Sequence, residues 1–124
     1  MRTRVLKKFK VCVFKVDGVV DINDDILAKC SRGINSYLAD SRYEGILHVE
    51  YIGGILVAYA TGVENEASYA VVNAFRSCST HYIGKVDAHY IGKVDAQIIG
   101  VEGSYTTRHI FVADCSLSRV LGYE

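Results

Sequence analysis

The chain has 124 residues, of which 50% are hydrophobic and 23% charged. This composition excludes a disordered or low-complexity chain, and the length suits one domain, so we expect a single α+β domain over residues 1–124. Fourteen basic residues balance fourteen acidic ones, and the resulting net charge of zero excludes whole-molecule attraction to polyanions.

The N-terminal third predicts a strand, a turn and a helix. β-Branched and aromatic residues predict a strand over Val5–Val16. Asp17-Gly18 is a hairpin signal, so Val19-Val20 is expected to begin a return strand. Asn23 is placed to cap a helix whose apolar residues recur at three- and four-residue steps as far as Leu38.

The middle of the chain predicts a hairpin and a second helix. Two β-rich runs flank Gly53-Gly54, which is typical of a tight hairpin. Thr61 is expected to cap the helix that follows, with Asn65 as the alternative. The apolar stripe of this helix has helical spacing and consists of Ala67, Ala70, Val71, Ala74, Phe75 and Cys78. Beyond it the chain is β-rich, with an expected turn at Glu102-Gly103-Ser104 and a strand over Tyr105–Ala113.

The order of these elements predicts an α+β fold. Strands, helix, hairpin, helix and strands indicate a two-layer sandwich of a mainly antiparallel sheet with two helices on one face. A ferredoxin-like βαββαβ plan with an extra strand is the first expectation. A longin- or profilin-like sheet is the alternative.

A tandem duplication is the most unusual feature of the sequence. The octapeptide 81–88 is repeated without change as 89–96. Strand side chains alternate between the two faces of a sheet, and eight is an even number, so we expect the residues after the duplication to keep their original faces. For the same reason we expect deletion of residues 89–96 to leave the fold intact. A straight strand from His81 to Glu102 would be about 70 Å long in a domain about 30 Å across. The segment is therefore expected to bend at its glycines, form its own hairpin or leave the domain.

The repeat also suggests the function. An extended strand with open backbone groups is a template for another chain, so we expect self-association by strand pairing, with a dimer as the expected state. Nine tyrosines and no tryptophan favour a contact surface for a protein partner or small ligand. The expected function is a small non-enzymatic interaction module with no cofactor, no metal and no assigned catalytic residue. The candidate binding residues all lie in the repeat: His81, Tyr82, Lys85, Asp87, His89, Tyr90, Lys93 and Asp95.

Two other functions compete with this one. A small-molecule-binding protein or enzyme could use the His/Lys/Asp face of the repeat, and it would need a pocket with a repeat histidine facing a carboxylate. Single-stranded nucleic acid could bind the basic N-terminal strand, where Lys7, Lys8 and Lys10 interleave with Phe9 and Phe14, but the zero net charge disfavours this. His48 and His109 are expected to be structural, with His109 beside Arg108 as a secondary candidate site.

The cysteines and the N-terminus bear on location. Cys12, Cys30, Cys78 and Cys115 occur singly, so the spacings of zinc and thioredoxin-like sites are missing. We expect reduced structural thiols in a cytoplasmic protein, with a disulfide as the alternative. No apolar run is long enough to span a membrane, and lysines interrupt the segment where a secretory signal would be apolar.

Overall fold

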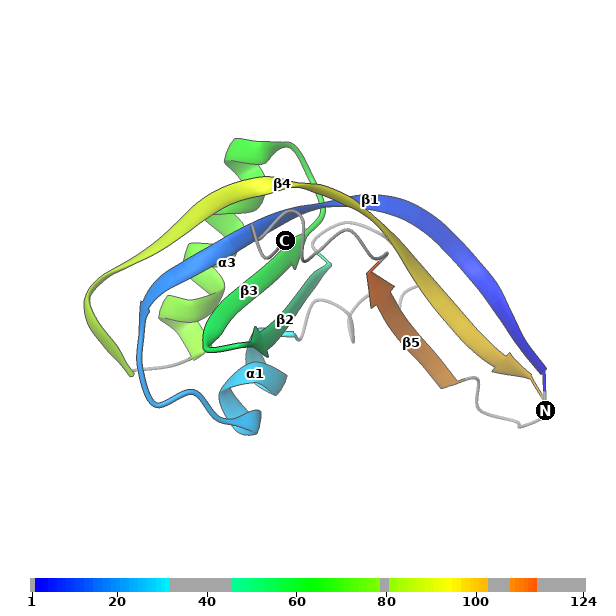
Figure 1. Cartoon of the computed structure of the whole chain (residues 1–124), viewed down its shortest axis with the longest axis horizontal. Coiled ribbons are helices and arrows are strands. Elements are labelled where there is room, and N and C mark those ends of the chain that lie inside the picture. The colour runs from blue at the N-terminus through cyan, green and yellow to red at the C-terminus, as the bar shows by residue number, and fades with distance from the viewer. Residues whose placement is uncertain (1, 32–45, 79–80, 103–107, 114–124) are drawn as a thin grey trace.

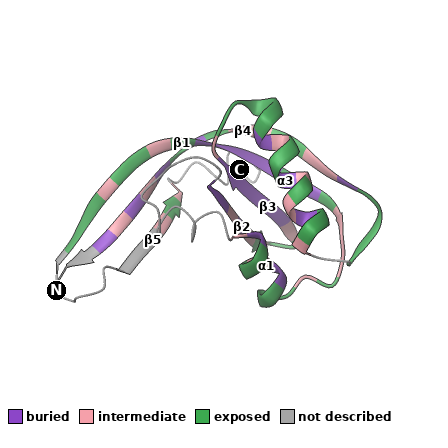
Figure 2. Ribbon diagram, turned by 180° about the vertical axis from the view of Figure 1, so that it is seen from behind, coloured by how far each residue is buried: buried purple, intermediate pink, exposed green. Residues whose placement is uncertain are grey.

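A computed structural model describes residues 2–31, 46–78, 81–102 and 108–113 of the chain. In chain order the elements are β1 (Arg2–Val19), α1 (Asp24–Cys30), β2 (Leu47–Ile52), β3 (Ile55–Ala60), α3 (Glu64–Cys78), β4 (Tyr82–Glu102) and β5 (Arg108–Ala113). The five strands form one antiparallel sheet in the order β2-β3-β1-β4-β5. Both helices pack on one face of it (Figures 1 and 2), so the predicted α+β class is confirmed.

The sheet is apolar on both faces near its centre. The helix-side core joins alternate residues of the strands, such as Phe14 and Ala58, to buried residues of α1 and α3, such as Phe75. A second cluster lies on the opposite face and consists of Val11, Val13, Val57, Tyr59, Val94 and Ala96. Residues 11–14 of β1 and the whole of β3 therefore read as continuous apolar runs rather than as an alternation of polar and apolar residues.

Two long strands, β1 and β4, form the spine of the molecule. They pair along almost their whole length and curve together in an arc, with β5 at the far end (Figure 1). The ladder is interrupted at three places, by Leu6 in β1, by Ile91 in β4 and by residues 83–86 of β4. Of the three alternatives expected for the repeat segment, the structure shows the bend, with interruptions at residues 83–86 and at Ile91, beside Gly92. The segment does not form a hairpin of its own.

The hairpin predicted at Asp17-Gly18 is wrong, because β1 continues to Val19. Gly18 has a φ of +96°, and a Cβ there would collide with the backbone carbonyl of Lys85. Glycine is needed at this position so that β4 can approach closely at its bulge. The glycine at this position is required by the close approach of two strands and not by a reversal of the chain.

The hairpin predicted at Gly53-Gly54 is confirmed. It joins β2 to β3, and Ile52 is in register with Ile55 across the turn. Both glycines have positive φ, 57° and 81°, as a tight two-residue turn requires. The expected turn at Gly103-Ser104, together with the expected strand residues Tyr105–Thr107, lies outside the described residues.

Both predicted helices are present, with different boundaries. The Asn23 side chain accepts the Ile26 N–H at 3.0 Å, which confirms it as the cap of α1. This helix ends at Cys30, and the later positions of its predicted stripe lie outside the described residues. The predicted cap Thr61 is wrong in position: α3 begins at Glu64, so Val63 is the residue before its first turn, and the Val63 carbonyl accepts the Ala67 N–H. No helix among the described residues is both long and apolar enough to cross a membrane.

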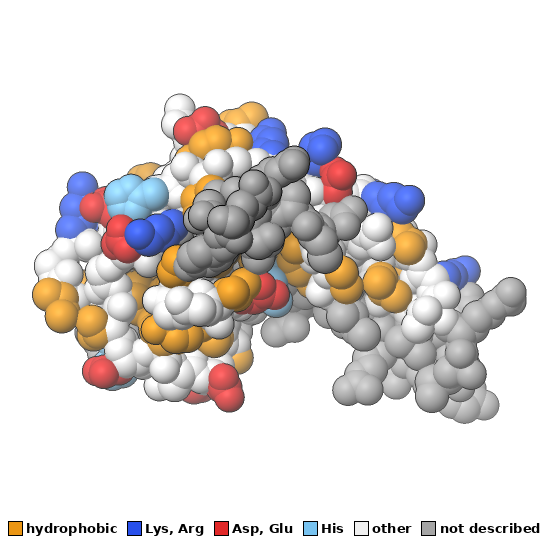
Figure 3. Space-filling view, in the orientation of Figure 1, with side chains coloured by type: hydrophobic (Ala, Val, Ile, Leu, Met, Phe, Trp, Pro, Cys, Tyr) orange, Lys and Arg blue, Asp and Glu red, His pale blue; other side chains and the backbone are white. Residues whose placement is uncertain are grey.

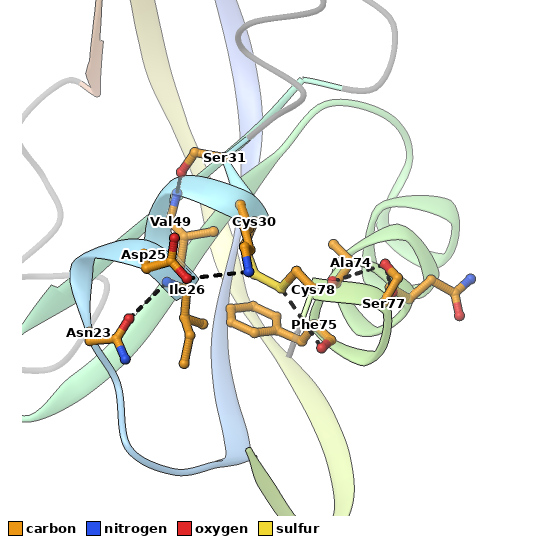
Figure 4. Close-up of a disulfide and its surroundings, with 12 residues drawn as sticks. Asn23, Asp25, Ile26, Cys30, Ser31, Val49, Ala74, Phe75, Ser77 and Cys78 are labelled. Carbon is orange, nitrogen blue, oxygen red and sulfur yellow. Dashed lines mark hydrogen bonds and ion pairs between the residues drawn. A yellow bond between two sulfur atoms is a disulfide. The ribbon is translucent and has the colours of Figure 1, made fainter. Parts of the chain in front are cut away.

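A disulfide links the last residues of the two helices. Cys30 of α1 and Cys78 of α3 are bonded across 48 residues of sequence, beside the buried ring of Phe75 (Figure 4). The prediction of reduced thiols is therefore wrong for this pair. It holds for Cys12, which is free and buried, and burial raises the pKa of its thiol. Cys115 lies outside the described residues.

Candidate functional site

Both copies of the octapeptide lie in the sheet, but they bury opposite faces. In the first copy, Val86 and Ala88 pack into the helix-side core. In the second copy, the equivalent Val94 and Ala96 pack into the cluster on the other face. The prediction that an even repeat keeps every residue on its original face is therefore wrong for this strand.

A one-residue bulge in β4 causes this reversal. Phe14 of β1 is in register with Tyr90, but Val13, the next residue, is in register with Gly92. Ile91 is the extra residue, and it packs on the same face as Gly92, against the cluster opposite the helices. One added residue shifts the alternation by one, and so it exchanges the faces of everything that follows.

Part of the predicted site is brought together on the face opposite the helices. His89 Nε2 lies 2.9 Å from Asp17 Oδ2, and Lys85 Nζ lies 3.8 Å from Asp87 Oδ1. Asp17 and Asp87 are directly opposite each other in the ladder. Figure 3 shows basic, acidic and histidine side chains gathered over this half of the β1–β4 pair. All four side chains are at least half exposed, so each ion pair contributes little to stability.

The rest of the predicted site lies elsewhere. Asp95 is on the other side of the bulge and pairs with Lys10 at 2.7 Å. Tyr90 packs edge-on against the buried Phe14 ring at 5.7 Å. His81 is at the beginning of the ladder, where its carbonyl accepts the Val20 N–H. The repeat therefore does not gather its eight candidate residues into one site.

The outer edge of β4 is the most distinctive feature of the repeat. β5 pairs only with residues from Ala96 onward. Between Tyr82 and Asp95, β4 has β1 on one side and no described strand on the other. Both copies thus present backbone hydrogen-bonding groups along one edge of the sheet, within the part of the chain that the structure describes.

The register shows which backbone groups face that edge. In an antiparallel sheet, successive residues of a strand direct their backbone N–H and C=O groups to opposite neighbours. The hydrogen bond from the Thr61 N–H to the Ile46 carbonyl shows which residues at the end of β3 face β2. The residue pairs between β3 and β1, and between β1 and β4, then give the direction of each backbone group in β4. On this alternation His89 directs its N–H and C=O toward β1. Ala88, its neighbour, directs the same groups toward the open edge.

A second polar cluster, on β2 and β3, was missed by sequence analysis. Glu50 interacts with His48 Nε2 at 2.9 Å and accepts the Tyr59 hydroxyl at 3.2 Å. Because a carboxylate only accepts, His48 carries its proton on Nε2. The ring of Phe111 lies 4.6 Å from the His48 ring and 5.8 Å from the Tyr59 ring. The spacing of His48 and Glu50 on one face of a strand was the available signal, but the pairing with Tyr59 depends on the register.

This cluster perturbs two ionisable groups. The contact with His48 holds the pKa of Glu50 below its ordinary value, against the opposing effect of partial burial. Burial, followed by the Glu50 charge, raises the pKa of Tyr59, which has no exposed surface. The hydroxyl of Tyr59 therefore stays protonated and remains a donor to Glu50 at any physiological pH.

We expect Glu50→Gln to lower stability at neutral pH but not in acid. A carboxyl with a depressed pKa contributes stability above its unfolded pKa of about 4.3 and loses it as the pH falls through the folded value. The stability difference between wild type and variant should therefore shrink in acid. Urea unfolding at about pH 7 and about pH 3 measures this. An equal difference at both pH values would contradict the role assigned to the charge.

The structure gives limited support to the two competing functions. Among the described residues, one hollow of about 380 Å³ lies beside Lys10 and Asp95, and another of about 380 Å³ lies beside Asp17 and Tyr51. Neither is lined by a repeat histidine. Within the described residues, no three potential ligands are placed to hold a metal ion. Neither hollow therefore places a repeat histidine opposite a carboxylate, as the small-molecule alternative requires.

The basic N-terminal strand does not present its aromatic residues as a base-stacking platform. Phe14 has no exposed surface and belongs to the helix-side core. Phe9 packs against Phe111 with ring centroids 6.1 Å apart. Lys10 is paired with Asp95. Stacking of bases needs accessible rings, so this arrangement disfavours the nucleic-acid alternative.

Comparison with known proteins adds no relative. No family model, no curated protein and no solved structure matches the chain.

Proposed function

We propose that this protein is a small interaction module that self-associates through the open edge of β4 and contacts its partners through the tyrosine-bearing surface beside that edge. The observation that carries the proposal is the edge from Tyr82 to Asp95, where no described strand lies opposite β1. An antiparallel neighbour supplied by a second copy would satisfy these backbone groups and extend the sheet.

Exposed apolar side chains along the same edge support the proposal. Ile83 is 72% exposed, and Tyr82 and Tyr90 are 44% and 40% exposed. Tyr69 of α3, the helix that packs against β4, is 71% exposed. Tyrosines are favoured at interfaces because they bury a large ring while the hydroxyl keeps a hydrogen bond.

The ferredoxin-like plan belongs to the same proposal. α1 connects β1 to β2 with β3 between them, and α3 connects β3 to β4 with β1 between them. These two interleaved β-α-β units support a ferredoxin-like sheet of β2-β3-β1-β4, to which β5 is added beside β4. The order fits the longin- or profilin-like alternative less well. In this plan β5 covers β4 only from Ala96 onward, so the part of β4 before Ala96 remains an edge of the sheet.

Blocking the edge should abolish self-association without unfolding the chain. Ala88→Pro removes an N–H that faces the open edge and leaves the hydrogen bonds to β1 in place. We expect wild type to be a dimer and Ala88→Pro a folded monomer by size-exclusion chromatography with light scattering. Ala88→Val is the matched control, because it retains the N–H, and it should remain dimeric.

Circular dichroism and thermal unfolding establish that the proline variant is folded. Wild type that stays monomeric over a wide range of protein concentration would contradict the proposal. So would an Ala88→Pro variant that is folded and as dimeric as wild type.

A further inference from the structure

We infer that two copies of this chain pair along the segment Tyr82–Tyr90, antiparallel and centred on Val86, so that each Lys85 lies opposite Asp87 of the other copy. This inference rests on the proposed self-association and specifies its geometry. It names the partner, a second copy of this chain, and the side chains that select it.

The ends of the pairing segment are set by the structure of β4. The bulge at Ile91 shifts the alternation, so residues on either side of it cannot belong to one regular edge. β5 occupies the edge from Ala96 onward, which leaves little room beyond the bulge. The open run before this bulge is therefore Tyr82–Tyr90, and within it residues 83–86 have no partner in β1. When a segment pairs antiparallel with its own copy, the two-fold axis passes through its midpoint, which here is Val86.

The backbone of this segment is suited to a new neighbour. No residue of β1 is in register with residues 83–86, because β4 bulges there past Gly18. At Val20 the ladder hydrogen bond goes to the His81 carbonyl, so Tyr82 directs its backbone groups outward. The alternation places Ala88 outward as well. Beside the axis, the Lys85 carbonyl faces Gly18 of β1 and Asp87 is in register with Asp17, so Val86 between them directs its backbone groups outward, as pairing about Val86 requires.

The charges of the segment complement themselves about the same axis. Lys85 and Asp87 lie on one face, 3.8 Å apart, and both are exposed. Antiparallel pairing about Val86 puts Lys85 of each copy opposite Asp87 of the other copy, so this contact forms twice per dimer. Opposite charges directly across an antiparallel pair stabilise it, and like charges there destabilise it.

The duplication adds an aromatic contact at each end of the segment. Tyr82 and Tyr90 are equivalent residues of the two octapeptides and are equidistant from Val86. Pairing about this axis places Tyr82 of one copy opposite Tyr90 of the other, where rings on paired strands contact each other. A single octapeptide would hold only one of these two rings.

The bulge also excludes the pairing that the sequence alone favours. Centring on Tyr90 would match Lys85 with Asp95 and Asp87 with Lys93. Lys85 and Asp87 lie with Asp17 on the face opposite the helices, whereas Asp95 lies with Lys10 on the other face. Residues on opposite faces of a sheet do not meet, so only pairing within the first copy keeps its ion pairs.

Charge reversal tests the inference. Asp87→Lys places like charges opposite each other twice per dimer, and we expect it to weaken dimerisation about tenfold or more. The double variant Lys85→Asp/Asp87→Lys is again self-complementary and should return to the affinity of wild type. Asp95→Lys is the matched control: it is the same change in the identical octapeptide, outside the pairing segment, and should have little effect. Analytical ultracentrifugation measures each dissociation constant.

The outcomes separate the two proposals. A wild-type chain that is monomeric throughout overturns the proposed self-association, and this inference with it. A dimer that Asp87→Lys weakens no more than Asp95→Lys overturns only the pairing about Val86. A double variant that stays as weak as Asp87→Lys has the same meaning, because restored complementarity should restore binding.

Cross-linking gives a second, independent readout. A chain carrying Tyr82→Cys, mixed with a chain carrying Tyr90→Cys, should form a disulfide-linked heterodimer, because directly paired residues are within disulfide range. Neither chain should form that bond alone. Equal cross-linking in the separate chains would overturn the stated register.

Discussion

Deleting residues 89–96 is expected to abolish the folded monomer, although the deletion leaves one intact octapeptide. In the folded chain Ala88 faces the helices and Ala96 faces the other way, because the bulge lies between them. Joining Ala88 directly to Gln97 would turn Ile98, which is 1% exposed, to the wrong face. Phe9–Lys15 of β1 would also lose their present partners. The loss should be about 5 kcal/mol or more, a large part of the stability of an ordinary domain.

Removing Ile91 alone provides the control. Tyr90 and Gly92 would then be consecutive, as their partners Phe14 and Val13 already are, and the ladder would be regular. We expect this one-residue deletion to fold. Circular dichroism and chemical unfolding of the two variants measure the difference. A cooperatively folded monomer lacking residues 89–96 would show that the copies do not face opposite ways in solution.

Removing the disulfide is expected to lower the free energy of unfolding by about 4 kcal/mol. A cross-link across 48 residues restricts the unfolded chain, and loop-closure entropy gives an effect of this size. Cys30→Ala/Cys78→Ala should therefore unfold at much lower urea concentration than wild type, and reductant should shift wild type but not the variant. Both thiols are at helix ends, so the helices themselves should persist.

Peptide mapping under non-reducing conditions identifies the bonded pair. Cys12→Ala serves as the control, since Cys12 is buried and free, and it should leave the response to reductant unchanged. Wild type whose unfolding does not respond to reductant, in a sample where the Cys30–Cys78 peptide is found, would contradict the predicted contribution. The disulfide also removes one support for the cytoplasmic expectation, which assumed reduced thiols.

Local patterns predicted the elements that depend on neighbours in sequence. Gly53-Gly54 predicted its hairpin because only a tight turn there needs two positive φ values. The stripe of α3 was found because helix side chains repeat with a fixed period, although Ala70 in that stripe is exposed. Gly18 was misassigned because its positive φ serves a contact with Lys85, far away in sequence. Local sequence indicates that a glycine is required at a position, but it does not show whether a turn or a close contact with another strand requires it.

The candidate site was predicted in part for the same reason. A bent strand was one of three alternatives for the repeat, and Lys85, Asp87 and His89 do lie on one face with Asp17. The separation of Lys93 and Asp95 from them depends on the one-residue bulge at Ile91. The octapeptide does not specify this bulge, because the same Tyr-Ile-Gly in the first copy lies in a longer interruption, at residues 83–86. The cluster of His48, Glu50 and Tyr59 needed the pairing of β2 with β3, which periodicity does not give.

Because the two octapeptides bury opposite faces, equivalent residues of identical local sequence can be compared in two different environments within one chain. Val86 and Val94 have the same neighbours in sequence but different neighbours in space, because they pack on opposite faces of the sheet. Differences in amide exchange, chemical shift or mutational cost between such a pair report the tertiary environment alone, because local propensity cancels. The local and tertiary contributions can therefore be separated within one molecule.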